Sequence, residues 1–355
     1  MSLPVQAIPL SRVREASTAE LRNWDQTLTR FAQHRVYHTI AWVRSIEKIT
    51  AAQAVFLIYE KNGRKTACLP GFVRRLGPLK VFGSPFEGCQ TESMGPLFDE
   101  KLATPAEFMP AFADYLEQRM GVQFIDLVAR GLDAEEMHTS GFTDQPIFTY
   151  RAPLSPHDES ETLARMKSNA RNHLRKAIKS GLTVRLEHEE DFIPECYDQI
   201  REVFTRRGNA VPFGQERVRV CFRAMRDSGN LIALSVRLPE TNQPVATGMF
   251  LADGRELILW CWTHRTEFRS HSPTELLMWT AMQEGMKRGC TSLDMTGGGD
   301  AKPKFGGVPD HSVRRWSRAR HPWLFTARDF ARRAYRLQQR VRGRLARAGS
   351  GTLHE

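Results

Sequence analysis

The 355-residue sequence lacks several features that would place it in a common functional class. Its six cysteines are scattered and include no C-x-x-C pair, which argues against a zinc site or a disulfide framework and favours reduced thiols in a cytoplasmic protein. No apolar run approaches the roughly 18–20 residues of a membrane-spanning helix. No basic segment leads into a long apolar core near the N-terminus, so a secretory signal is not expected.

The two common phosphate-binding motifs are also absent, although one glycine-rich stretch comes close to them. This stretch, SLDMTGGGDAKPKFGG, covers residues 292–307. A P-loop would need a glycine where Ala301 stands and a hydroxyl residue where Pro303 stands, and the dinucleotide pattern G-x-G-x-x-G would end on Lys302. The stretch therefore predicts a strand end and a flexible loop that carries the sequence K-P-K-F-G at 302–306.

Acidic residues are nearly missing from the C-terminal end. Residues 314–347 contain twelve arginines, no lysine and one acid, Asp329, so this segment accounts for the whole net charge of +11. The remainder is charge-balanced and does not have the composition of a nucleic-acid-binding body. Apolar residues recur at helical spacing within 328–346, so we expect a basic amphipathic helix there. We expect its apolar stripe to dock on the protein itself, with an anionic membrane or RNA as alternative partners.

Two parts of the chain repeat the same series of signals. Predicted strands precede a helix that opens with Ser or Thr, Pro and a Glu capping box, and a further strand follows. From Thr104 and from Ser272, the terminal glycine lies 17 positions on, and an aspartate of the next strand, Asp126 or Asp294, lies 22 positions on. We predict a duplicated α/β unit, each with a mixed sheet and flanking helices. Helices are expected at 18–33, 39–49, 104–121 and 272–289, and strands at 54–60, 122–128, 230–238, 243–252 and 256–263.

A strongly basic helix is predicted at residues 163–181, LARMKSNARNHLRKAIKSG. One face is apolar, and six Lys or Arg residues with no acid occupy the rest. Arg171 and Arg175 lie one turn apart and could act together on an anionic ligand. The alternative is an ordinary solvated helix face.

The second half carries the candidate chemistry. The helix that starts at Ser272 follows strand 256–263, and its N-terminus offers backbone N–H groups and a favourable dipole to an anion. The loop HRTEFRSHS at 264–272 adds Arg269 to this end. A phosphate-bearing donor could bind here, and the alternative is a simple helix cap with a solvated basic loop.

Two residues are candidates for a general base. Asp294 ends an apolar strand, where it could remove a proton, hold a lysine such as Lys304, or cap the glycine loop. His264 at the strand exit has a suitable unperturbed pKa, and its alternative role is that of a polar edge residue.

In this order, the motifs resemble the GNAT-like acyltransferases related to the Fem peptidyltransferases. The resemblance covers roughly residues 40–320 and is strongest at 163–184 and 260–306. It implies an α/β protein of the α+β type, with mixed sheets in two tandem GNAT-like domains. Domains are expected at 1–152 and at 153–320, the second carrying the site, with a basic amphipathic helix and tail at 321–355.

The resemblance also implies transfer of an acyl or aminoacyl group to an amine or hydroxyl of a cell-envelope or exopolysaccharide precursor. GNAT enzymes generally hold the donor pyrophosphate at an R/Q-x-x-G-x-G/A turn, which corresponds here to Arg269 through Thr274. Ser272 and Thr274 replace both glycines. This change argues against ordinary acetyl-CoA use and leaves an acyl carrier or a charged tRNA as donor. Lys304 and Phe305 resemble a lysine–phenylalanine stretch of Fem relatives.

The resulting hypothesis is a cytoplasmic, metal-free acyltransferase that uses acyl-CoA or another acyl donor. Lys302 and Lys304 would neutralise a phosphate, and backbone N–H groups of the strand carrying Trp260 and Trp262 would stabilise an oxyanion. Nucleic acid would bind only as a charged tRNA, and the C-terminal helix would reach an anionic inner membrane. The alternatives are a non-catalytic GNAT-like scaffold and an RNA- or membrane-surface-binding protein.

Overall fold

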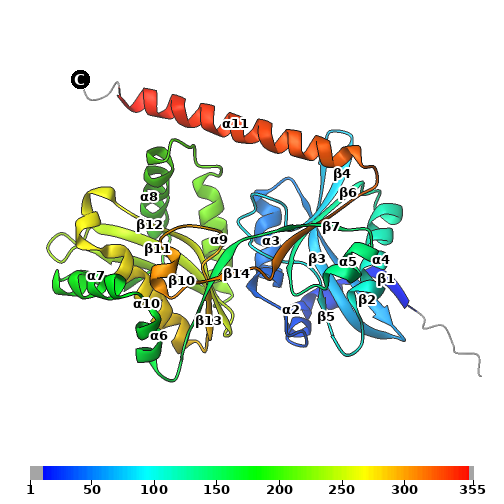
Figure 1. Ribbon diagram of the computed structural model, residues 1–355, viewed down its shortest axis with the longest axis horizontal. Coiled ribbons are helices and arrows are strands. Elements are labelled where there is room, and N and C mark those ends of the chain that lie inside the picture. The colour runs from blue at the N-terminus through cyan, green and yellow to red at the C-terminus, as the bar shows by residue number, and fades with distance from the viewer. Residues whose placement is uncertain (1–10, 352–355) are drawn as a thin grey trace, which may run out of the picture. The chain divides into compact units, whose positions relative to one another are not determined.

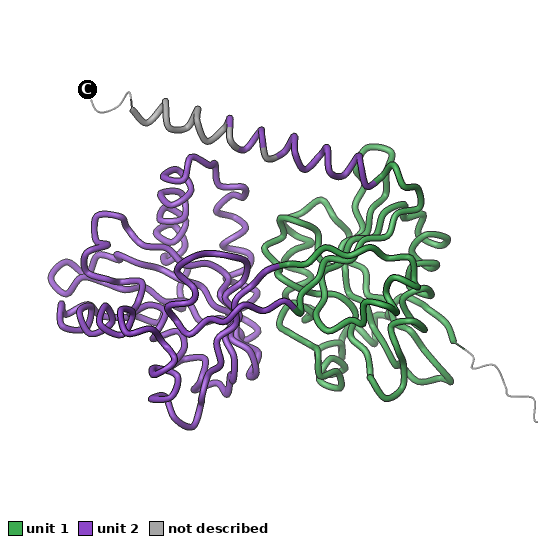
Figure 2. The backbone as a smooth tube through the Cα atoms, viewed as in Figure 1, with its two compact units in different colours: residues 1–147, 312–324 green, residues 148–311, 325–355 purple. Residues whose placement is uncertain are grey.

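The computed structural model describes residues 11–351, apart from the side chains of 336, 340 and 342–351. The chain forms two compact units (Figure 2). Unit 1 contains residues 1–147 and 312–324, and unit 2 contains residues 148–311 and 325–355. These ranges differ from the expected boundaries after residues 152 and 320. The main reason is that the strand at 149–153 lies wholly in unit 2 and the strand at 313–319 lies in unit 1.

Each unit contains one mixed sheet with flanking helices (Figure 1). The order in unit 1 is β1-β2-β3-β4-β6-β15-β7, with β5 paired to β3, and the order in unit 2 is β9-β10-β11-β12-β13-β8-β14. In unit 1 the strands are β1 Ser11–Glu15, β2 Gln53–Lys61, β3 Arg64–Leu76, β4 Leu79–Ser84, β5 Leu97–Phe98, β6 Phe124–Arg130, β7 Thr143–Pro146 and β15 Val313–Ala319. In unit 2 they are β8 Thr149–Pro153, β9 Thr183–Leu186, β10 Leu231–Arg237, β11 Pro244–Ala252, β12 Glu256–His264, β13 Ser292–Asp294 and β14 Val308–Asp310.

The two sheets have matching topology. Both have one parallel pair, β4 with β6 and β12 with β13, and the other neighbours are antiparallel. A parallel pair needs a crossover, which α4 (Pro105–Asp114) and α10 (Pro273–Lys287) provide. The predicted mixed-sheet architecture of two related domains is confirmed.

The last strand of each half lies in the sheet of the other half. β8 ends the first half but pairs with β13, and β15 ends the second half but pairs with β6. Burial explains the position of β15, because its Trp316 is fully buried in the hydrophobic core of unit 1. The segment 313–319, expected in the second domain, therefore belongs to the first sheet.

The helices largely follow the sequence pattern, with two breaks. The predicted helix 18–33 divides at Asn23 into α1 (Thr18–Arg22) and α2 (Trp24–Leu28). The basic helix divides into α6 (Glu159–Arg165) and α7 (Ser168–Lys179), because Met166 and Lys167 have extended backbone. The other helices are α3 Ile40–Ile49, α5 Ala134–Thr139, α8 Phe192–Arg206, α9 Gln215–Asp227 and α11 Trp323–Gly351, with short turns η1 Val36–His38, η2 Tyr115–Arg119, η3 Thr266–His271 and η4 Lys302–Phe305.

The expected docking of the apolar stripe of α11 is wrong for the part of the stripe that the structure describes. Phe330, Leu337 and Val341 are 75%, 64% and 48% exposed. None of the helices among the described residues is both long and apolar enough to cross a membrane.

In unit 2, α10 packs its apolar side directly on the sheet. Leu277, Met282 and Leu257 are buried in one core with no exposed surface. Gly285 allows this close approach, since a Cβ there would lie 2.9 Å from a Leu257 methyl carbon. The N-terminus of α10 is thereby fixed next to β12.

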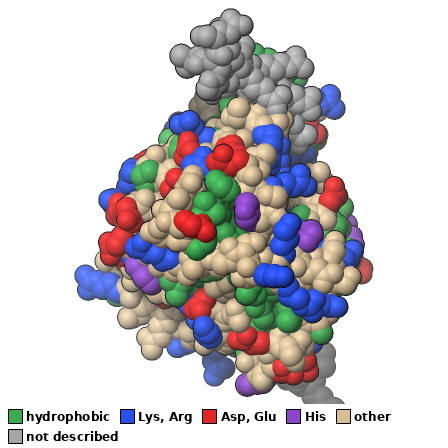
Figure 3. All heavy atoms as spheres, turned by 90° about the vertical axis from the view of Figure 1, so that its left-hand side faces the viewer, with side chains coloured by type: hydrophobic (Ala, Val, Ile, Leu, Met, Phe, Trp, Pro, Cys, Tyr) green, Lys and Arg blue, Asp and Glu red, His purple; other side chains and the backbone are tan. Residues whose placement is uncertain are grey.

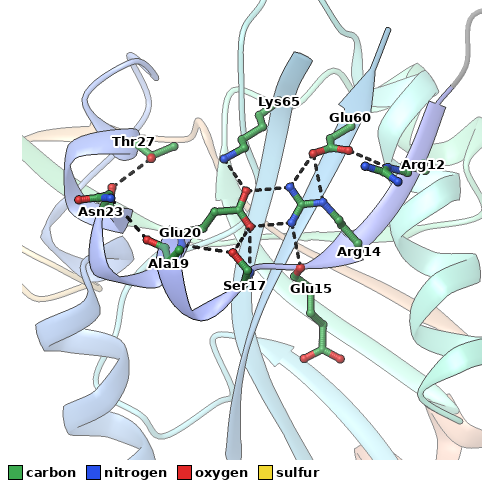
Figure 4. A network of polar contacts seen from close by, with 10 residues as sticks. All are labelled: Arg12, Arg14, Glu15, Ser17, Ala19, Glu20, Asn23, Thr27, Glu60 and Lys65. Carbon is green, nitrogen blue, oxygen red and sulfur yellow. Dashed lines mark hydrogen bonds and ion pairs between the residues drawn. The ribbon is translucent and has the colours of Figure 1, made fainter. Parts of the chain in front are cut away.

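In unit 1, an ionic network fixes the first strand to the sheet (Figure 4). The Arg14 guanidinium lies between Glu20, at 2.6 Å, and Glu60, at 2.6 Å, and Lys65 also pairs with Glu20. Glu20 also accepts the Ser17 backbone N–H at 2.8 Å, which caps α1. The hydrogen bonds from Arg14 lower the pKa of both carboxyl groups below their usual range.

Candidate functional site

Strands β12 and β13 separate at one edge of the unit 2 sheet. Their parallel pairing ends at Ile258 opposite Asp294, whereas β12 continues to His264. Trp260 is an extra residue in the register with β11, and such a bulge bends the strand that contains it. Within the described chain, the edge of β12 that faces β13 has no partner strand beyond this point.

The corresponding edge in unit 1 is closed. Its parallel pair β4–β6 continues to Ser84, the last residue of β4, and the pairing of β3 with β4 has no bulge. In unit 2 the indole N–H of Trp260, the bulge residue, is buried and has no hydrogen-bond acceptor among the described residues. The opening thus distinguishes the second unit from the first.

The start of α10 lies next to this opening and leaves donors unused. Ser272 is the N-cap residue, but it has a left-handed backbone (φ 58°, ψ 42°) and its side chain does not cap the helix. Pro273 has no N–H group. The N–H groups of Thr274 and Glu275 belong to the orphan donors of a first turn, and no acceptor for them exists in the described structure. The predicted capping box at Ser272 is therefore wrong, and the helix N-terminus remains open to an anion.

Carboxylates of the protein occupy the matching helix start in unit 1. The Thr104 N–H donates to Glu107 at 3.2 Å, as the predicted capping box requires, and the Ala106 N–H donates to Glu136 at 3.0 Å. Of the two helix starts, the one in unit 2 therefore has N–H groups without an acceptor among the described residues.

His264, at the end of β12, faces this turn. Its Nδ1 lies 3.3 Å from the Thr274 hydroxyl oxygen, and its Nε2 is buried without a partner among the described residues. Burial lowers the pKa of His264, and the nearby charges of Arg206 and Arg269 lower it further. The imidazole is therefore neutral at pH 7. With the proton on Nδ1, donated to Thr274, the Nε2 lone pair is free to accept a proton.

Lys304 is bound by a carboxylate that the sequence suggested only as a helix cap. Its ammonium group lies 2.6 Å from Glu275, which is 4% exposed, and His173 Nδ1 lies 3.4 Å from the same oxygen. The ammonium group also lies 4.9 Å from the ring centre of Phe305, and that ring meets Trp262 edge-on at 5.6 Å. Glu275 therefore connects α10 to the K-P-K-F-G loop and β12.

Asp294 and Lys302 both close the glycine loop. Asp294, 2% exposed, accepts the Thr149 hydroxyl at 3.0 Å and the Thr296 N–H at 2.9 Å. The Lys302 ammonium group turns back to the carbonyls of Thr296 and Gly297, the latter at 2.8 Å. These contacts match the loop-capping alternative for Asp294, and they join the Lys302 ammonium group to the backbone of the same loop.

The predicted arginines lie in different surroundings. Arg269 is exposed, and in the described part of the chain it makes no ion pair or hydrogen bond through its side chain. Arg171 donates to the carbonyls of Ala164 and Met166 and so caps the end of α6. Arg175 donates to the Asn172 side chain at 2.8 Å. Of these three arginines, Arg269 is the one whose side chain makes no such contact within the described residues.

The structure thus gathers His264, Arg269, Ser272, Thr274, Trp262, Lys304 and Phe305 around the start of α10. Sequence reasoning missed the buried Trp260 indole and the ionic role of Glu275. No local signal marks either role, since each depends on residues that the fold brings near. On the face shown in Figure 3, basic and acidic side chains are interspersed.

A metal site is not found among the described residues, where no cluster of three His, Cys, Asp or Glu side chains is suitable. All six cysteines are free thiols.

Residues 164–304 match the family model described as an acetyltransferase (GNAT) domain. This segment contains α7, β12, α10 and the residues Lys302 to Lys304, so the similarity to a GNAT domain includes most of the candidate site. No curated protein matches the sequence significantly.

Several solved structures share the whole tandem fold. FemX has a TM-score of 0.70 at 11% identity, covering 89% of this chain and 99% of its own. A tandem GNAT protein from the clavulanic acid biosynthesis pathway has a TM-score of 0.54 at 12% identity, covering 89% and 99%. L-PGS from Bacillus licheniformis has a TM-score of 0.53 at 12% identity, covering 88% and 95%. At these identities the likeness establishes the fold.

Proposed function

We propose that this GNAT-fold acyltransferase moves an acyl or aminoacyl group from a phosphate-bearing ester or thioester donor to an amine or hydroxyl of a cell-envelope or exopolysaccharide precursor. The observation that carries the proposal is the open first turn of α10. Two backbone donors and one unpaired arginine, Arg269, surround it, and the matching turn of unit 1 is filled by a carboxylate.

The donor phosphate binds at the N–H groups of Thr274 and Glu275, with Arg269 as its counter-charge. The left-handed backbone at Ser272 supports this, because it is a conformation that glycine favours and a glycine occupies this position in the family turn. Ser272 and Thr274 stand where the family turn, which holds the donor pyrophosphate, has glycines. The loss of both glycines favours a charged tRNA or a carrier-bound acyl group over acetyl-CoA as donor.

His264 is the general base in this mechanism. The acceptor amine or hydroxyl attacks the donor carbonyl carbon and gives its proton to Nε2, and the C–O or C–S bond to the donor then breaks. His264 returns the proton to the leaving oxygen or sulfur. His264 is favoured over Asp294 because the Asp294 carboxylate already accepts two hydrogen bonds.

The developing oxyanion lies along the unpaired edge of β12, near Trp260, where backbone donors have no partner strand. Acceptor and donor would meet where β12 and β13 separate. A cytoplasmic location fits a donor made in the cytoplasm and the six free thiols.

The donor class is tested by thermal shift, because a ligand that binds the folded protein raises its apparent stability. The panel contains CoA thioesters, acyl carriers and charged tRNAs, each with its unacylated form. One class is expected to raise the melting temperature of wild type, and Arg269→Ala should weaken this effect. Arg30→Ala, an exposed arginine of unit 1, is the matched control and should behave as wild type.

The base is tested by transfer, measured as release of thiol or deacylated tRNA in the presence of amine and hydroxyl acceptors. His264→Gln should lower kcat by roughly 10²- to 10⁴-fold with donor binding retained. Full transfer by this variant would reject His264 as the base. Absence of both binding and transfer with every donor would instead favour the non-catalytic scaffold.

A further inference from the structure

The C-terminal helix α11 has an apolar stripe on one side. Apolar residues recur every three or four positions, which keeps them on one line of the helix surface. They are Trp323, Ala327, Phe330, Ala334, Leu337 and Val341. The large members are well exposed, from 48% at Val341 to 75% at Phe330. This exposure is unusual, because large apolar side chains in a row are normally covered.

Between residues 324 and 332, the other side of the same helix is the more buried one. Leu324 is 3% exposed, and the side chains of Arg328 and Arg332 are 24% and 19% exposed. The helix thus shields arginines and presents its apolar side chains. An amphipathic helix that served only to cover the protein would have the reverse orientation.

The charges around the stripe are almost all positive. The sequence of α11 holds eight arginines, no lysine and one acid, Asp329. That acid already pairs with Arg328 at 2.9 Å, and Arg332 lies 3.9 Å from it. The helix therefore has no free carboxylate in its described part to pair with a basic partner.

We propose that α11 binds the surface of an anionic lipid bilayer, with the stripe formed by Trp323, Phe330, Leu337 and Val341 inserted at the headgroup boundary. Trp, Phe and Leu on one side with arginines beside them match the physical requirements of a helix that lies in a membrane interface. The apolar residues contribute burial, and the arginines add attraction to acidic headgroups.

The same observations argue against two other partners. A second copy of the helix would bring arginines against arginines with no acid left to pair, which disfavours a coiled coil. RNA would satisfy the arginines, but it would leave Phe330 and Leu337 in water. Only an anionic bilayer accommodates both features.

The test is flotation of the full-length protein with vesicles of phosphatidylglycerol and of phosphatidylcholine. Wild type should float with phosphatidylglycerol vesicles and not with phosphatidylcholine vesicles, and binding should weaken as salt screens the arginines. The double variant Phe330→Ser with Leu337→Ser should bind phosphatidylglycerol vesicles at least about tenfold more weakly, because it loses two inserted side chains. Both residues are exposed, so the fold should tolerate the change.

A matched control replaces two exposed leucines elsewhere, Leu76→Ser with Leu102→Ser, and should bind vesicles as wild type does. Equal vesicle binding by the stripe variant and wild type would overturn the proposal. Loss of wild-type self-association in the stripe variant, measured by sedimentation velocity, would overturn it in favour of a dimer. Binding of wild type to RNA but not to phosphatidylglycerol vesicles would overturn it in favour of nucleic acid.

Discussion

The ion pair between Lys304 and Glu275 gives the sharpest test of how the site is built. The Glu275 side chain is 5% exposed and the Lys304 side chain 24%. Lys304→Met removes the positive charge but keeps an unbranched side chain of similar length beside the Phe305 ring. The Glu275 carboxylate then remains buried, with His173 Nδ1 3.4 Å away.

Loss of one partner of a buried ion pair costs about 3–5 kcal/mol, and the partial exposure of Lys304 places the expected loss near the lower end, about 3 kcal/mol. For a unit of this size, about 2–4 °C of melting temperature corresponds to 1 kcal/mol, so a decrease of roughly 6–12 °C is expected. The double variant Glu275→Gln with Lys304→Met carries neither charge and should recover most of this loss.

The assay is thermal and urea unfolding, fitted with separate transitions for the two units because a multidomain chain need not unfold in one step. The control is Lys287→Met, which removes another lysine that pairs with a glutamate of the same region. The Lys287 side chain is 64% exposed, so its loss should cost less than about 1 kcal/mol. If Lys304→Met unfolds as wild type does but weakens donor binding, Lys304 is a phosphate ligand and the structural reasoning is wrong.

Three further predictions concern other groups. Lys302→Met should destabilise unit 2 by about 1–3 kcal/mol in urea unfolding, because two loop carbonyls lose a charged donor, and it should leave donor affinity unchanged; a selective loss of affinity would contradict this. Arg14→Met should remove an acid-sensitive part of unit 1 stability. The pKa values of Glu20 and Glu60 are lowered in the folded state, so their contribution is present above the unfolded pKa of about 4.3 and is lost as pH falls, and a variant with unchanged pH dependence of unfolding between pH 3 and 7 would refute it. Because the pKa of His264 is lowered, the acid limb of kcat/KM should lie below the ordinary histidine value of about 6.5 and be absent in His264→Gln; a limb that persists in the variant would belong to another group.

Local features of the fold could be predicted because they depend on neighbours in the chain. Thr104 and Glu107 lie three positions apart and form the predicted cap contact. Asn62 and Gly63, a pair typical of a tight hairpin turn, both have positive φ, a backbone that few other residues tolerate. Ser272 shows the limit of this reasoning. The same Ser/Thr-Pro-x-Glu pattern occurs there, but the Ser272 side chain forms no capping hydrogen bond.

The sequence by itself determined the mixed sheets, the repeated strand–helix–strand unit and the position of the candidate turn, since hydrophobic period, caps and glycines act over a few residues. Only the tertiary structure decided which strands exchange, which carboxylate holds Lys304, and which side of α11 is exposed. Glu275 and Lys304 lie 29 positions apart, and Thr149 and Asp294 lie 145 apart. Contacts of that range form because a buried charge or donor needs a partner inside the protein, and burial is a property of the packed sheet and not of any short segment.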